Sequence, residues 1–232
     1  MAQLFGQTIE FDPGNRRLAV AEQTYLKQYC ALIHGQVIID ALLSIRTAHQ
    51  LRGDDVAAVT LEVIQSAYDI AGGGAFGDKN RPWTKEQADY NLKYLSAVAL
   101  LDGGVGPEQL ETERVRRDDV QALLTRIAVV PAADLTADYP ERTGVRVSVR
   151  THDGRELHHR QADYEGSPTQ PLSWERVVEK FHWLAEPCSE GGLRGEIIEA
   201  VERLDEIHVT DLTGLLGRVS PVAVRARSAV RF

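Results

Sequence analysis

The chain has 232 residues, of which 26 are Lys or Arg and 34 are Asp or Glu, so its net charge is −8. An acidic surface is repelled by phosphate backbones and anionic lipid, which argues against nucleic acid and membrane partners. With 43% hydrophobic residues, the chain is long enough for one sizeable globular domain or two small ones.

The cysteines and the first residues indicate the compartment. Only Cys30 and Cys188 are present, without the paired spacing of a disulfide framework, a zinc site or an iron–sulfur site. Residues 1–10 lack the basic flank and apolar run of a secretory signal. No stretch approaches the ~18 apolar residues that a membrane span requires. We therefore expect a soluble, cytoplasmic protein that uses no metal and no cofactor.

The first predicted elements are a helix and a strand. Residues 36–50 place apolar side chains at helical spacing, which predicts a helix with one buried face. Residues 59–63 alternate apolar and polar side chains, the pattern of a half-buried strand. The glycines at 72–77 have the spacing of a dinucleotide-binding loop, but residues 78–82 cannot open the helix that such a loop needs. We interpret these glycines as a flexible loop.

A capped and then buried helix is predicted next. Thr84 is a good N-cap, and Gln87 completes a capping box. The helix is expected to continue through Tyr94–Leu101, which is apolar almost all round and should therefore be buried centrally. The Asp-Gly-Gly sequence at 102–104 ends it.

The middle of the chain predicts strands. A short helix over 118–125 leads into a strand at 127–130, which Pro131 ends. Residues 145–149 alternate valine with polar side chains, and Asp153-Gly154 offers the positive-φ turn of a hairpin. The return strand is expected to run from Leu157 toward Tyr164.

The C-terminal part predicts helices. Ser173 caps the first of two or three helices over 173–216, whose apolar stripes need a partner surface. The expected fold is therefore α+β, a small mixed or antiparallel sheet with packed helices, followed by a C-terminal helical segment. The expected divisions are a lead-in at 1–24, an α+β domain at 25–170, the C-terminal helices at 171–217 and a basic tail at 218–232. The tail holds four arginines and no acid, so we expect it to be solvated, with binding to an acidic surface as the alternative.

The seven histidines do not predict a metal site. His158 and His159 are neighbours in a predicted strand and so point to opposite faces, and the others lack ligand spacing.

Residues 27–36 are the strongest functional candidate. They place the cation of Lys27, the imidazole of His34 and the amide of Gln36 in an irregular loop ahead of a helix. A carboxylate bound there would gain a charge-assisted hydrogen bond from Lys27 and the field of the helix N-terminus. His34 could act as acid or base near neutral pH. In the alternative interpretation, His34 caps the helix and Lys27 is solvated.

Four ordered motifs resemble the MmgE/PrpD family, the 2-methylcitrate dehydratase family, over about residues 25–215. Residues 29–36 read YCALIHGQ, similar to the family's aromatic-Pro-Ala-x-x-His-x-Gln segment. Residues 78–94 (DKNRPWTKEQADYNLKY) and 97–103 (AVALLDG) resemble the stretch that enters and forms its buried helix. Residues 135–142 (LTADYPER) and the hairpin with Asp153-Gly154 follow in the family's order.

The resemblance implies a two-domain enzyme with an all-helical N-terminal domain and a smaller α+β lid, in which the final helices return to the helical domain. This chain is similar to the lid plus those helices and would by itself lack a complete active site. Family members dehydrate 2-methylcitrate, decarboxylate cis-aconitate or epimerise iminodisuccinate, and all of them move a proton beside a carboxylate. The implied partners are a small polycarboxylate substrate and a helical N-terminal chain, and the chain is expected to be a homo-oligomer.

On the matching positions, the resemblance implies that His34 and Tyr94 are catalytic and that Lys27 and Gln36 bind the substrate. Without the resemblance, Tyr94 is interpreted as a core aromatic of a buried helix and Gln36 as a residue of a helix start.

The chain also departs from the family pattern. Cys30 stands at the usual Pro, which leaves the loop less rigid, and Leu32 stands where the decarboxylases have His, which favours dehydration over decarboxylation. Tyr90-Asn91 replaces a frequent His-Ser, so the substrate is left open.

Three functions are compatible with these residues, in this order. The first is the C-terminal part of a hydro-lyase that needs a helical partner chain, which predicts exposed apolar area on residues 173–216. The second is a non-catalytic carboxylate-binding module. The third is an isomerase or decarboxylase of the same family.

Overall fold

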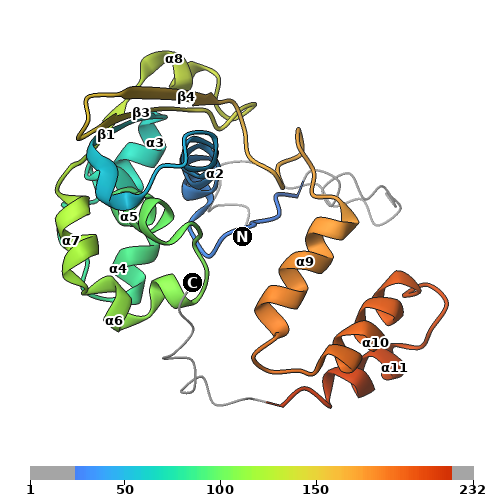
Figure 1. Cartoon of the computed structure of the whole chain (residues 1–232). Helices are drawn as coiled ribbons and strands as arrows, with labels where there is room; N and C mark the ends of the chain where they lie inside the picture. Colours follow the sequence, from blue (N-terminus) through green and yellow to red (C-terminus); the bar gives the residue numbers. More distant parts are fainter. Residues whose placement is uncertain (1–23, 221–232) are drawn as a thin grey trace. The chain divides into compact units, whose positions relative to one another are not determined.

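The computed structural model describes residues 24–220, so nearly all of the predicted lead-in and most of the predicted basic tail lie outside the described residues. The chain divides into two compact units, one ending at Pro171 and the other beginning at Leu172. In chain order, the helices and strands of the first unit are α2 (Ile33–Ala48), η2 (Gly53–Asp55), β1 (Val56–Val63), α3 (Gln65–Ala67), η3 (Tyr68–Gly72), α4 (Lys85–Asp89), α5 (Leu92–Asp102), η4 (Glu108–Leu110), α6 (Thr112–Val115), α7 (Asp118–Leu124), β2 (Ile127–Pro131), α8 (Ala133–Ala137), β3 (Val145–Thr151) and β4 (Glu156–Gln161). The second unit contains α9 (Trp174–Ala185), α10 (Gly191–Glu202) and α11 (Val209–Leu216) (Figure 1).

The described strands form a mixed sheet in the order β2-β1-β3-β4. β1 pairs with β2 in parallel and with β3 antiparallel, and Leu61 stands between Val129 and Val147 in this register. The predicted hairpin is confirmed, since β3 and β4 pair antiparallel through the turn at Gly154, where φ is +88°. The α+β class with a small mixed sheet is therefore confirmed.

Two helices cover one face of the sheet. α2 packs on β3 and β4, and α5 packs on β2, while α8 lies on the opposite side (Figure 1). The alternation predicted for β1 is confirmed, because Val59, Leu61 and Val63 are buried beneath these helices. α2 and α5 approach closely at Gly35, where an added Cβ would lie 2.8 Å from Cδ1 of Leu95. The hydrophobic core thus holds the start of α2 in a fixed position.

The prediction of one continuous helix from Thr84 to Leu101 is wrong in one respect, because the structure has two helices in this segment. The Thr84 capping box is present, but it starts only the short helix α4, which ends at Asp89 with Tyr90 as its C-cap. Asn91 then caps α5: its Oδ1 accepts a hydrogen bond from the backbone N–H of Tyr94 at 3.0 Å, and its Nδ2 donates to the carbonyl of Lys79 at 2.9 Å. A buried side chain that satisfies both a helix start and a loop carbonyl outweighs the helix propensity of its neighbours.

The two caps should differ in their effect on stability. We expect Asn91→Ala to lower the free energy of unfolding by about 1–3 kcal/mol, because it removes a cap and leaves buried polar groups unpaired. Thr84→Ala, at an exposed five-residue helix, should lower it by about 1 kcal/mol or less. Urea unfolding of both variants measures this difference, and equal effects would contradict the assigned role of Asn91.

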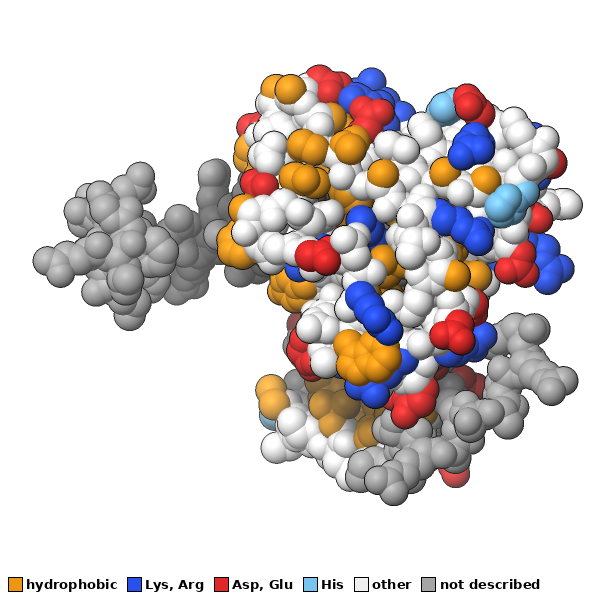
Figure 2. Space-filling model, turned by 90° about the vertical axis from the view of Figure 1, so that its left-hand side faces the viewer, with side chains coloured by type: hydrophobic (Ala, Val, Ile, Leu, Met, Phe, Trp, Pro, Cys, Tyr) orange, Lys and Arg blue, Asp and Glu red, His pale blue; other side chains and the backbone are white. Residues whose placement is uncertain are grey.

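The open face of the sheet is polar. Arg146 of β3 forms ion pairs with Glu62 of β1 and with Asp134 of α8, which ties α8 to the sheet. The predicted opposite orientations of the neighbouring histidines are confirmed, since His158 pairs with Ser148 and His159 with Val147 in the register. On the face drawn in Figure 2, basic and acidic side chains are interspersed, so neither sign of charge forms a continuous patch there.

The second unit has little core of its own in its described part. Ser173 caps α9 as predicted, its Oγ accepting from the N–H of Arg176, yet no residue of α9 or α11 is buried. The buried hydrophobic residues in 172–220 are Leu193 and Ile197 of α10. The exposed large hydrophobic side chains of this unit are Trp174, Trp183, Leu184, Val201, Leu204, Val209 and Leu216.

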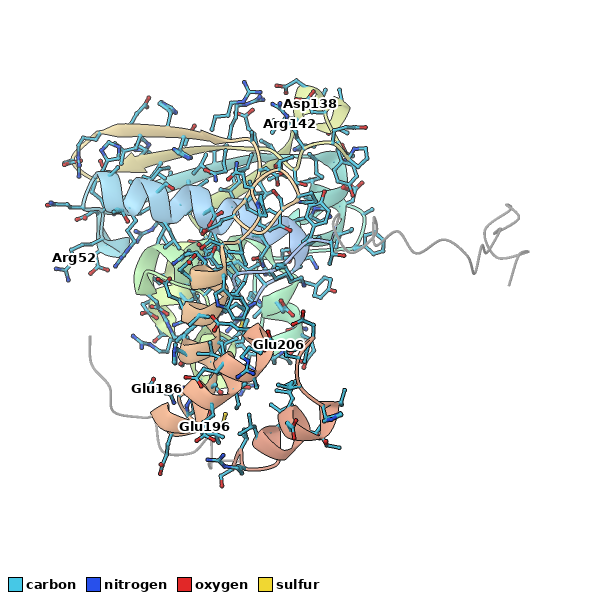
Figure 3. All side chains as sticks on the ribbon, turned by 90° about the vertical axis from the view of Figure 1, so that its right-hand side faces the viewer. Arg52, Asp138, Arg142, Glu186, Glu196 and Glu206 are labelled. Atoms are coloured by element: carbon cyan, nitrogen blue, oxygen red, sulfur yellow. The ribbon has the colours of Figure 1, made fainter. Side chains whose placement is uncertain are left out.

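Arg218 is the arginine of the predicted basic tail that the structure describes. Its side chain is exposed, as expected of a solvated tail, and it forms a surface ion pair with Glu196 of α10, which Figure 3 labels. The other three arginines of the tail lie outside the described residues. Between residues 24 and 220, none of the helices has both the length and the apolar character needed to cross a bilayer.

Candidate functional site

The loop ahead of α2 is held by one buried glutamine. Oε1 of Gln36 accepts hydrogen bonds from the backbone N–H groups of Gln28 and Tyr29, at 2.9 and 3.0 Å. Its Nε2 donates to the carbonyls of Tyr29 and Ala31, at 3.1 and 3.2 Å. All four bonding positions of the amide are therefore used by the loop backbone. The substrate-binding role predicted for Gln36 stays a prediction, whereas its part in shaping this loop follows directly from these contacts.

The loop is anchored to the rest of the first unit as well. The N–H of Cys30 donates to the carbonyl of Val105 at 3.0 Å, and the N–H of Leu26 donates to the carbonyl of Gly166 at 2.8 Å. Lys27 lies between these anchors with an exposed side chain. A lysine whose backbone is fixed and whose side chain is exposed can reach a carboxylate that enters from solvent.

His34 lies in the first turn of α2, and only 7% of its surface is exposed. Its Nδ1 is buried without a hydrogen-bond partner among the described residues. Burial lowers the pKa of His34 below its ordinary value of about 6.5, because the imidazolium loses its hydration. The imidazole is therefore neutral at pH 7 and can accept a proton, which is what a general base requires. The expectation that His34 caps the helix is wrong, since α2 has no side-chain cap.

The lowered pKa of His34 should appear in the pH dependence of stability. Below about pH 6.5 the unfolded chain takes up a proton on this histidine that the folded chain resists, so the free energy of unfolding falls as the pH falls. We expect His34→Gln to lose less stability than the wild type between about pH 7 and pH 5. Urea unfolding at several pH values measures this slope. Identical slopes for the two proteins would show that His34 titrates alike when folded and unfolded.

The aromatic ring of Tyr139 lies next to His34. Their ring centroids are 6.4 Å apart with an angle of 58° between the planes, within the range of an aromatic contact. Tyr139 belongs to the loop between α8 and β3, and its neighbours Asp138 and Arg142 are labelled in Figure 3. The motif at residues 135–142 contains this tyrosine, but nothing local in the sequence indicates that it meets a histidine so far away along the chain.

Tyr94 has different surroundings. Its side chain is fully buried, and its hydroxyl donates a hydrogen bond to the carbonyl of Gln109. Burial raises the pKa of this phenol far above its usual value. The charge of Arg114 lowers the pKa and that of Asp102 raises it, both by less than burial does. The contacts of the described residues thus join Tyr94 to the segment after α5 and join His34 to Tyr139. The catalytic role predicted for Tyr94 stays a prediction, and it would require the hydroxyl to leave Gln109.

The surface of the first unit has two notable hollows. One is an open groove along α2 lined by Tyr29, Asp40, Leu43, Ser44, Thr47 and Ala48. The other is a small cavity beside the loop that follows α8, lined by Leu135, Asp138, Arg142, Gly144, Arg160, Gln161 and Ala162. Lys27 and His34 line neither of them. Within residues 24–220, no three His, Cys, Asp or Glu side chains gather closely enough to hold a metal ion.

A known protein family is similar to the part of the chain that contains His34 and Tyr94. Residues 29–206 match the MmgE/PrpD C-terminal domain. The cis-aconitate decarboxylase of Homo sapiens is 26% identical over 152 residues, which cover 64% of this chain and 31% of that protein. The cis-aconitate decarboxylase of Mus musculus is 24% identical over 130 residues, covering 55% of this chain and 26% of that protein. The chain thus matches less than a third of the length of these curated relatives.

Proposed function

Because the chain belongs to the MmgE/PrpD family, as its C-terminal domain, we propose that it forms one side of the active site of a lyase acting on a small polycarboxylate. The other side is supplied by a helical part that this sequence does not contain. The helices α9–α11 support this arrangement, because they leave large apolar side chains exposed. Assembly with further copies of the same chain and a place in the cytoplasm belong to the proposal.

The observation that carries the proposal is the environment of His34. A neutral imidazole with an unpartnered, buried nitrogen lies in the first turn of a helix, beside an anchored loop that presents Lys27. A base next to a cation suits the removal of a proton beside a carboxylate, since the cation stabilises the negative charge that develops. Substrate carboxylates would bind Lys27 and backbone N–H groups at the α2 N-terminus.

We propose dehydration of a 2-methylcitrate-like acid as the reaction. His34 takes the proton from the carbon beside a carboxylate, and the C–H electron pair forms the double bond. The neighbouring C–O bond breaks, and the departing hydroxide becomes water with a proton that the imidazolium returns directly or through solvent. Leu32, where the decarboxylases of the family have histidine, favours this reaction.

Decarboxylation is the second candidate, because the curated relatives named above are cis-aconitate decarboxylases. In that reaction a C–CO₂ bond breaks, CO₂ leaves, and the resulting carbanion takes up a proton from the protonated base. The same imidazole would then act as an acid.

The test uses the chain as it occurs in its own cells, recovered through an affinity tag together with any chain that binds it. The assembly is supplied with 2-methylcitrate and, separately, with cis-aconitate. Ultraviolet absorbance follows the new double bond, and NMR of labelled substrate follows loss of CO₂. Dehydration supports the main proposal, and CO₂ loss alone supports the second. Binding of citrate by calorimetry without any turnover would replace both with a carboxylate-binding module.

A further inference from the structure

The loop that follows α8 brings a second functional group to His34. Tyr139 is 44% exposed, so its ring covers part of the histidine while the rest faces solvent. Among the described residues its hydroxyl has no hydrogen-bond partner. A phenol hydroxyl can both donate and accept a hydrogen bond, so it can bind a carboxylate that approaches beside His34.

Hydrogen bonds anchor the chain on both sides of Tyr139. On the N-terminal side, Oγ1 of Thr136 accepts from the N–H of Gln65 at 2.9 Å and donates to the carbonyl of Ala132 at 2.8 Å. On the C-terminal side, the N–H of Arg142 donates to the carbonyl of Asp138 at 3.0 Å, and the chain enters β3. Together with the Asp134–Arg146 ion pair, these contacts anchor the backbone on both sides of Tyr139.

Tyr25, which is 40% exposed, lies on the Lys27 segment and packs against the buried Tyr164. Their ring centroids are 6.1 Å apart. Burial raises the pKa of Tyr25, and the charge of Asp163 adds to this rise. The backbone beside Lys27 is bound to α2 through Gln36, and the loop after α8 meets α2 at His34, so both segments border the start of α2.

We infer that Tyr139 is a substrate-binding residue of this site. Its hydroxyl donates a hydrogen bond to one carboxylate of the polyacid, and the carbon next to that carboxylate faces the His34 imidazole. The inference rests on the proposed function and adds a residue to it. In this assignment Lys27 and Tyr139 bind carboxylates of the substrate, and His34 takes the proton from the carbon beside one of them. Tyr139 exchanges no proton with the substrate, so the bonds made and broken are those given above.

The buried Nδ1 of His34, which has no hydrogen-bond partner within residues 24–220, supports this assignment. A buried, unsatisfied Nδ1 is unfavourable unless a group that binds there pairs with it. The exposed part of the nearby Tyr139 ring marks where solvent meets this region.

The experiment compares Tyr139→Phe with Tyr68→Phe in the tagged assembly. Tyr139→Phe keeps the ring that covers His34 and removes only the hydroxyl, and Tyr68 lies in η3, outside the proposed site. We expect Tyr139→Phe to raise KM and the calorimetric Kd for citrate by about 10- to 100-fold, the effect of a hydrogen bond to a charged group. The kcat should stay within about threefold, since the base is untouched. Tyr68→Phe should match the wild type in all three quantities.

The outcomes separate this inference from the proposed function. If Tyr139→Phe binds citrate and turns over like the wild type while His34→Gln is inactive, the proposed function stands and Tyr139 is not a substrate ligand. If Tyr139→Phe lowers kcat at an unchanged Kd for citrate, the hydroxyl acts elsewhere than in binding and the inference is wrong. If the wild-type assembly neither binds citrate nor turns over either acid, the proposed function fails and the inference with it.

Discussion

His34→Gln is expected to lower kcat of the assembled enzyme by about 10²- to 10⁴-fold, the usual contribution of a general base. Glutamine approximates the size of the imidazole and can donate a hydrogen bond from its amide, but it cannot take up a proton at neutral pH. KM should change little, because carboxylate binding is assigned to other groups. Steady-state kinetics with the preferred acid measures both quantities.

His158→Gln is the matched control. This histidine lies on the open face of the sheet, where Nδ1 meets the hydroxyl of Ser148 at 2.9 Å. We expect wild-type kinetics from it. If His34→Gln retains most of the wild-type kcat with its fold intact by circular dichroism, His34 is not the base, and the proton is taken by a group of the helical part.

Gln36→Ala is expected to lower the free energy of unfolding by about 2–4 kcal/mol, since four backbone groups lose their partner at once. Each group that water cannot reach is left unsatisfied in a partly buried loop. The substitution should also weaken substrate binding, because Lys27 is part of this loop. Urea denaturation gives the stability change, and calorimetry with citrate gives the affinity.

Gln65→Ala provides the comparison for that variant. The exposed Gln65 side chain makes one hydrogen bond, from Nε2 to Oδ1 of Asp69 at 3.0 Å. Its removal should change the free energy of unfolding by less than about 1 kcal/mol. A similarly small effect of Gln36→Ala would mean that water replaces the glutamine amide without loss.

Much of the fold follows from local patterns. The alternation around Leu61 predicts β1, the Asp153-Gly154 turn predicts the hairpin, and the Ser173 cap predicts α9, because each signal depends on residues close together in the sequence. The break at Asn91 could not be predicted this way. Its Nδ2 bonds the carbonyl of Lys79, a contact that exists only once the loop before α4 has folded back.

The candidate site likewise has features that follow from local sequence patterns and features that only the fold reveals. His34 stands out in the sequence because it is predicted in an irregular loop ahead of a helix. The structure corrects this position, since α2 begins at Ile33 and includes His34, and the burial of His34 follows from the packing of α2 on the sheet. The role of Gln36 in holding the loop depends on backbone groups whose directions no side-chain pattern reveals. Tyr139 reaches His34 from another loop, so only the folded structure brings the two rings together.

The position of β1 between β2 and β3 has a consequence for synthesis on the ribosome. All of residues 64–126 must be translated after β1 before its first neighbour, β2, exists, and β3 comes later still. Until then both edges of a largely apolar strand present unpaired N–H and C=O groups, the arrangement that invites pairing with other nascent chains. The charge of Glu62 and the helices of the intervening segment, made first, are the features of this chain that oppose such pairing.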